Sequence, residues 1–185
     1  MPQSKAQKFL YALITVVITV CAFVFYSLFV INGSTFLAAA SAAGTETTSV
    51  LAAIKAIGGI AVLGHQVPVW AVMLIEFALA LACECLVGSP LSEKLAAKHL
   101  NFKTASPHAI ENAIIKSTVF VMVPLMSFLA TILYYPYASG FAILTFLATW
   151  LKTLCLNFPF AYFGQIFFIQ PTVRTIFKAL FARKK

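Results

Sequence analysis

Four long stretches of this 185-residue chain are apolar and nearly free of charge, and short polar or basic segments separate them. The first covers residues 9–31 and would form a helix of about 34 Å at a rise of about 1.5 Å per residue. Because the hydrocarbon core of a bilayer is about 30 Å thick, this stretch predicts a membrane span that ends at Asn32-Gly33-Ser34.

The other three stretches predict spans at residues 67–87, 117–135 and 142–169. The second is expected to end at Gly88-Ser89-Pro90, and Pro171 marks the expected exit of the fourth. Short amphipathic surface helices are expected at residues 92–98 and in the basic tail at 172–185. The predicted fold class is all-α, an integral membrane four-helix bundle.

The segment between the first two spans is harder to assign. Residues 32–50 are rich in Ser, Thr, Ala and Gly and predict an exposed loop. Residues 51–63 are too few to cross a bilayer, so we expect a short helix at or dipping into the interface, with Lys55 near the outer surface. Two closely spaced full crossings are the alternative.

A secretory signal is a competing interpretation of the first span, because Lys5 and Lys8 precede it and small residues follow at 38–43. The apolar core of such a signal is only about 7–15 residues long. The stretch at residues 9–31 is longer than that. A retained span is therefore favoured.

The composition supports a membrane protein. Hydrophobic residues make up 62% of the chain and charged residues 10%, whereas soluble domains carry about 25% charged residues. The mean hydropathy is +0.96. These values exclude a soluble globule and a disordered chain. The four Cys, including Cys83 and Cys85 on either side of Glu84, have no zinc or disulfide spacing, so no metal and no cofactor are predicted.

The basic residues lie on one side of the predicted membrane. Lys and Arg number two before the first span, four in residues 91–116 and five after Pro171, against Lys55 alone in residues 32–66. The positive-inside rule then places both termini and the central segment in the cytoplasm. Basic residues at these places lie beside anionic lipid head groups, so the lipid bilayer is the expected partner and nucleic acid is not.

The two halves of the chain resemble each other. Aligning Lys8 with Lys116 pairs Thr19 with Ser127 and Tyr26 with Tyr134, and aligning Pro90 with Pro171 pairs Glu76 with Asn157 and Glu84 with Gln165. This predicts two tandem helix-pair repeats, residues 1–100 and 101–185, with an extracytoplasmic insertion at about 32–66. Both pairs run in the same direction, so their symmetry axis should lie along the membrane normal.

Three short motifs carry a family resemblance: Glu76-Phe77, Asn157-Phe158 and the exit Pro171-Thr172-Val173-Arg174. With them the chain resembles the two-repeat form of the bacterial membrane family called domain of unknown function 2798. Residues 32–66 are longer than the resemblance leads one to expect. The resemblance implies a multi-pass protein of the bacterial cytoplasmic (inner) membrane and, as the family name states, no established activity.

Polar side chains inside the spans are the candidate functional residues, since an ionisable group at the bilayer centre costs about 2.5 kcal/mol or more. We expect a polar intramembrane seam between the repeats, formed by Glu76, Glu84, Lys152, Asn157 and Gln165. In a structural role, Glu76 would pair with Lys152 and accept a hydrogen bond from Asn157. In a functional role, the seam would bind or pass a solute. Glu84 lies close to the cytoplasmic interface, and we expect it to snorkel to that interface rather than to act as a site.

No catalytic motif accompanies the seam, so an enzyme is not expected. The favoured hypothesis is a structural or accessory membrane protein of unknown biochemical activity. The alternative is a small solute, ion or proton transporter that uses the seam. Four helices are few for a transport path, so the alternative would call for a homodimer, and the sequence does not identify a ligand.

The predicted topology can be tested by thiol labelling in a Cys-free background. Single cysteines at Ser41 and Ser139 should react with an impermeant reagent applied to intact cells, because both positions are expected outside. A cysteine at Ser106 should react only after the cells are permeabilised. Labelling at Ser106 in intact cells would reverse the orientation.

Overall fold

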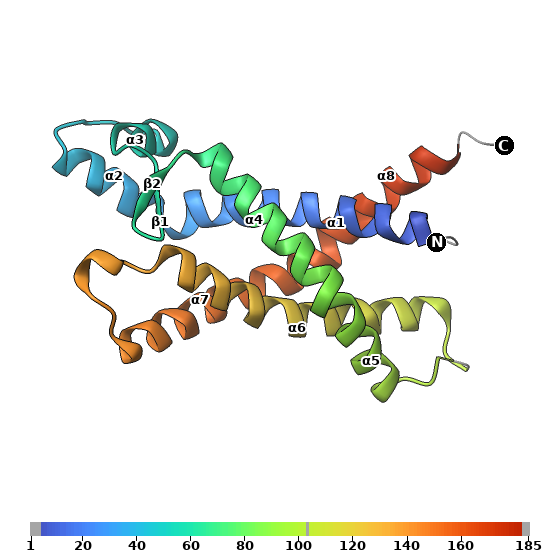
Figure 1. Cartoon of the computed structure of the whole chain (residues 1–185). Helices are drawn as coiled ribbons and strands as arrows, with labels where there is room; N and C mark the ends of the chain where they lie inside the picture. The colour runs from blue at the N-terminus through green and yellow to red at the C-terminus, as the bar shows by residue number, and fades with distance from the viewer. Residues whose placement is uncertain (1–4, 103, 183–185) are drawn as a thin grey trace.

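The computed structural model describes residues 5–102 and 104–182, and within them the chain forms eight α-helices and one small β-hairpin (Figure 1). The helices are α1 (Lys5–Phe25), α2 (Gly33–Ala42), α3 (Val50–Ala56), α4 (Val69–Cys83), α5 (Ser89–His99), α6 (Pro107–Tyr134), α7 (Ile143–Gly164) and α8 (Gln170–Ala182). The strands are β1 (Ile60–Val62) and β2 (His65–Val67). Three π-helical segments extend α1, α4 and α7: Tyr26–Ile31, Glu84–Gly88 and Gln165–Ile169.

Four continuous helices in the described residues are long and apolar enough to cross a membrane: Phe9–Ile31, Val69–His99, His108–Tyr134 and Ile143–Phe181. The predicted all-α class with four long apolar spans is confirmed, and the first span has the predicted limits. Large apolar side chains such as Leu86, Leu144 and Phe168 are exposed, as contact with lipid tails requires. The chain is a multi-pass membrane protein.

Two predicted helix ends are wrong, because the helices continue through Pro90 and Pro171 into α5 and α8. The backbone N–H of Ser89 donates to the carbonyl of Glu84, and that of Gln170 donates to Gln165, so each bond spans five residues instead of four. A proline ring normally collides with the carbonyl four residues before it. The wider π turn just ahead of each proline relieves that conflict. The expected surface helices are therefore parts of longer helices.

The third span is also longer than its prediction. The helix α6 runs without a break from Pro107, ten residues before the predicted limit. The Ser106 hydroxyl accepts a hydrogen bond from the backbone N–H of Ala109 at 3.3 Å and so caps the first turn. Pro107 at the first turn suits a helix start because its missing N–H has no partner there anyway.

The segment at 33–67 is a compact cap, not the predicted loop and thirteen-residue helix. Its Ala-rich start forms α2, because alanine is the strongest helix former. Then α3 ends at Ala56, and Gly58-Gly59 leads into a hairpin with Val62 opposite His65. Leu63 and Gly64 both have positive φ, which is the geometry of a two-residue hairpin turn.

Ala53, Ile54, Ile60 and Val62 of the cap are all buried, and the last three belong to the same hydrophobic cluster as Val24 of α1 and Val72 of α4. The cap lies at the same end of the bundle as the α6–α7 turn, and the backbone N–H of Leu63 donates to the carbonyl of Leu133 at 2.7 Å. Figure 1 places both termini and the α5–α6 connection at the opposite end.

The spans exchange partners along their length. In the half nearer the cap, α4 packs on α1 and α7 packs on α6. Beyond the π-helical segments, α5 packs on α6 and α8 packs on α1. The second span therefore packs on α1 near the cap and on α6 beyond it, and the fourth span packs on α6 near the cap and on α1 beyond it. This crossing gives the bundle its open X shape (Figure 1).

The hairpin fold depends on Gly59, which has a φ of +128° and lies so close to β2 that an added Cβ would be 2.5 Å from the Val67 carbonyl oxygen. We expect Gly59→Ala to destabilise the cap by about 1–3 kcal/mol from the clash, in addition to the backbone strain. Gly44→Ala is the matched control, since Gly44 also has positive φ but open space around it. Limited proteolysis within residues 33–67 should speed up in Gly59→Ala well beyond the control. Equal rates would contradict the close approach.

Candidate functional site

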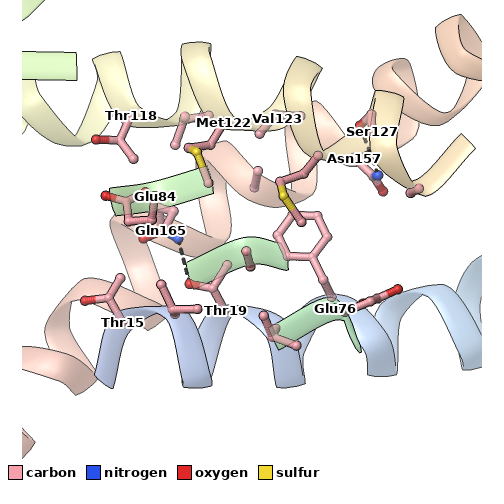
Figure 2. Close-up of a pocket in the computed structure, with 18 of the residues that line it drawn as sticks. Thr15, Thr19, Glu76, Glu84, Thr118, Met122, Val123, Ser127, Asn157 and Gln165 are labelled. Carbon is pink, nitrogen blue, oxygen red and sulfur yellow. Dashed lines mark hydrogen bonds between the residues drawn. The ribbon is translucent and has the colours of Figure 1, made fainter. Parts of the chain in front are cut away.

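A cavity of about 1160 Å³ lies between the four spans. It extends from Asn32 and Ile60 beneath the cap to Arg174 and Lys178 near the opposite end. Side chains from α1, α4, α6 and α7 converge on it (Figure 2). All five residues of the predicted polar seam line this cavity: Glu76, Glu84, Lys152, Asn157 and Gln165. Sequence reasoning thus selected side chains that the fold brings to one space, and their role remains a prediction.

Glu76 is held by a tyrosine from the other half of the chain. The hydroxyl of Tyr134, the last residue of α6, donates to Glu76 Oε1 at 2.5 Å. Hydrogen bonding of this kind offsets part of the cost of placing a carboxyl group in an apolar surrounding. Sequence reasoning did not select Tyr134, although the repeat alignment paired it with Tyr26.

The expected partners of Glu76 are wrong. Among the described residues the one ion pair within 4.0 Å joins Arg174 to Glu111, and Lys152 forms none. Asn157 Nδ2 donates to Ser127 Oγ at 3.3 Å instead of to Glu76. The prediction assumed that the second and fourth spans are neighbours. Instead α4 packs on α1 and α7 packs on α6, so the two spans contribute separate walls of the cavity.

Glu84 begins the π-helical segment after α4, and its Oε1 accepts a hydrogen bond from Ser89 Oγ at 2.8 Å. Gly88 makes room for the carboxylate, since a Cβ at that position would be 2.6 Å from Glu84 Oε2 and 2.7 Å from Met122 Sδ. The side chain is half-buried and lines the cavity. This placement disfavours the snorkelling alternative, because a snorkelling side chain turns outward along the lipid surface.

Gln165 occupies the corresponding place after α7 and is part of a chain of hydrogen bonds. Its Nε2 donates to Thr19 Oγ1 at 3.0 Å, and its Oε1 accepts from Gln170 Nε2 at 3.2 Å. The Tyr11 hydroxyl donates to Gln170 Oε1 at 2.8 Å. These bonds fix the start of α8 against α1. Figure 2 shows Gln165 reaching Thr19 across the space that Glu84 also faces.

The end of the cavity farthest from the cap carries the ion pair that sequence reasoning missed. Arg174 Nη2 lies 2.9 Å from Glu111 Oε1. The two residues are 63 positions apart, so no local pattern links them. Glu93 and His108 also line this end. Among the residues described, no three His, Cys, Asp or Glu side chains are grouped so that they could hold a metal ion.

Residues 113–181 match the family model described as domain of unknown function (DUF2798). The match covers most of α6 together with α7 and most of α8, which bring Asn157, Gln165 and Arg174 to the cavity. The resemblance inferred from the sequence is confirmed for this part of the chain. Neither the curated proteins nor the solved structures contain a match.

The hydrogen bond from Tyr134 to Glu76 leads to a prediction about the free energy of unfolding. Removing the phenolic hydroxyl leaves the Glu76 carboxyl in the cavity without its donor, so Tyr134→Phe should lower the free energy of unfolding in detergent by about 1–3 kcal/mol. Tyr26→Phe is the matched control, because its exposed hydroxyl donates only to the Leu156 carbonyl at 3.3 Å. Lys152→Met should be close to neutral. A larger loss in Lys152→Met than in Tyr134→Phe would restore the ion-pair hypothesis.

Proposed function

We propose that this protein is a small membrane transporter that binds a solute in the central cavity and passes it along the polar seam. The observation that carries this proposal is the cavity itself, which is about 1160 Å³ and contains Glu76 and Glu84 within the spans. Ionisable residues inside a membrane generally face a bundle interior or a water-filled cavity and mark substrate or ion pathways. Here both carboxyl groups line the cavity while large apolar side chains face outward.

The polar residues of the cavity are spread along its length, which suits passage of a solute better than one fixed site. Asn32 lies near the cap, Glu76 and Asn157 follow, and Glu84 and Gln165 lie at the π-helical segments. Beyond them are Glu111 and Arg174. A solute moving through the cavity would exchange one set of polar partners for the next.

The proposal includes two tandem repeats, residues 1–100 and 101–185, with the cap at 32–66 inserted in the first. The shift of 81 residues that aligns Pro90 with Pro171 also superimposes the π-helical segments Glu84–Gly88 and Gln165–Ile169. It superimposes the side-chain bond between Ser89 and Glu84 on the bond between Gln170 and Gln165. Coincident π segments support a common origin, because such segments are rare.

The packing of the helices supports the same repeat. In the proposed repeat, the contact between α1 and α4 corresponds to the contact between α6 and α7. The contact between α1 and α8 corresponds in the same way to the contact between α6 and α5, and all four contacts are present. It also relates Tyr134, which reaches Glu76 in α4, to Tyr26, which reaches Leu156 beside Asn157 in α7. A two-fold axis along the membrane normal accounts for both observations.

We further propose a location in the bacterial cytoplasmic membrane with both termini inside. The termini and the α5–α6 connection lie at one end of the bundle, and this end carries the basic segments (Figure 1). Such clustering is what the positive-inside rule expects of the cytoplasmic side. The cap and the α6–α7 turn would then lie outside. Because the cavity is formed within one chain, the transport proposal does not need the homodimer considered from the sequence.

An accessory role is the second candidate function, and the bonds that join the halves favour it. Tyr134 binds Glu76, and Gln165 binds Thr19, so the polar side chains already have partners within the chain. A dry interface of this kind would serve only to hold the halves in register. The two functions differ in whether water fills the cavity.

Thiol labelling at two neighbouring positions of α6 separates the candidates. Ala130 lines the cavity, whereas Phe128 is exposed on the outer surface and is not among the lining residues. In a Cys-free background, Ala130→Cys should react with a small hydrophilic thiol reagent in native membranes, because the cavity is hydrated. Phe128→Cys should not react, because lipid excludes water and the thiolate is the reactive form. An unreactive Ala130→Cys would favour the accessory role.

A further inference from the structure

We propose that the cavity takes a monovalent organic cation with a mostly apolar body, with the Glu76 carboxylate as its counter-ion. This inference rests on the proposed function and names the substrate class. It follows from three features of the cavity: its charge, the free carboxylate oxygen of Glu76, and the character of its walls.

The charge of the membrane-embedded part of the cavity is unbalanced. Glu76 and Glu84 come from one half of the chain, and the residues that align with them in the other half are the amides Asn157 and Gln165. Lys152 is the basic residue that lines this part of the cavity, and it forms no ion pair within 4.0 Å among the described residues. Two carboxyl groups and one amine thus border this part of the cavity, in a region where an uncompensated charge is costly. A cationic ligand would restore the balance.

One carboxyl oxygen of Glu76 is free to accept a hydrogen bond or contact a cation. Tyr134 donates to Oε1, and the hydrogen bonds among the described residues leave Oε2 without a donor. Because Glu76 lines the cavity, a ligand there has a carboxylate oxygen to approach. Tyr134 lines the cavity beside the same carboxyl group, and aromatic rings attract organic cations.

The size and walls of the cavity argue against an inorganic ion. Pockets for drug-sized ligands are about 300–1,000 Å³ and mainly apolar, with a few placed polar groups. At about 1160 Å³ this cavity is somewhat larger than that range, and Val, Ile, Leu, Ala and Phe make up about half of its lining residues. Met122 and Met126 contribute flexible thioethers that adapt to ligands of different shape. A small metal ion would need several ligands grouped at one point, and among the described residues no three His, Cys, Asp or Glu side chains are grouped in that way.

An anionic ligand fits less well. Of the basic residues that line the cavity, Arg174 and Lys178 lie at the end far from the cap, where Arg174 is paired with Glu111, and Lys152 shares the membrane-embedded part with Glu76 and Glu84. Glu93 lies at the same end. An anion would therefore pass paired or opposed charges before meeting two carboxylates, and like charges repel strongly where the dielectric constant is low.

Binding of two isosteric probes to the full-length protein in detergent tests the proposal. Tetraphenylphosphonium should bind saturably in isothermal titration calorimetry, and tetraphenylborate, with the same shape and opposite charge, should bind at least tenfold more weakly. Glu76→Gln should weaken phosphonium binding at least tenfold, and Glu76→Asp, which keeps the charge, should weaken it by less. Glu46→Gln is the control, because this exposed carboxylate lies in the cap and outside the cavity.

Equal binding of the two probes, or phosphonium binding that Glu76→Gln leaves unchanged, would overturn the proposal. A co-purified phospholipid that phosphonium fails to displace, detected by native mass spectrometry, would overturn it as well. These failures differ from failure of the transporter proposal. If Ala130→Cys reacts but phosphonium does not bind, only the proposed substrate class is rejected. If Ala130→Cys does not react, the hydrated path of the transporter proposal is rejected.

Discussion

The absence of water from the bilayer core is the constraint on which this structure depends. Each backbone N–H and carbonyl inside the membrane must find its partner within the chain, so a span cannot simply stop where the sequence contains Gly and Pro. At Glu84–Gly88 and Gln165–Ile169 the hydrogen bonds instead shift by one residue, and the helices continue through Pro90 and Pro171. The second and fourth spans thereby become long enough to cross from one partner helix to the other. The bundle is open because these two helices continue past their prolines and cross.

The crossing explains why polar groups gather where they do. Two pairs of helices that diverge on either side of a crossing leave space between them, and side chains on the inner faces border that space. Tyr134 of α6 donates a hydrogen bond to Glu76 of the second span, and Thr19 of α1 accepts one from Gln165 of the fourth span. The same bonds that satisfy these polar groups also tie the two halves together. Cohesion of the bundle and polarity of the cavity therefore have one origin.

The apolar stretches were sufficient to predict four spans, since length and hydropathy are local properties, and residues 9–31 were correct at both ends. The sequence also selected Glu76, Glu84, Lys152, Asn157 and Gln165, because polar groups in a span are costly wherever they point. It could not provide their partners. The bond from Tyr134 to Glu76 joins positions 58 apart and depends on which helices are neighbours. The cap was missed because Gly58-Gly59 and Leu63-Gly64 turn an apolar stretch into a hairpin, which apolar content alone does not distinguish from a helix.

The differences between the halves carry as much information as their likeness. If the polar side chains served only to hold the two halves of the chain in register, amides on both sides would suffice, as Gln165 bound to Thr19 shows. The first half instead carries carboxyl groups at both aligned positions, Glu76 and Glu84, although a carboxylate costs far more than an amide in a membrane. Glu84 and Gln165 differ only in that charge, and both accept a side-chain bond from the residue five positions ahead. Because structure alone does not require the charge, the charge is the feature that a ligand would use.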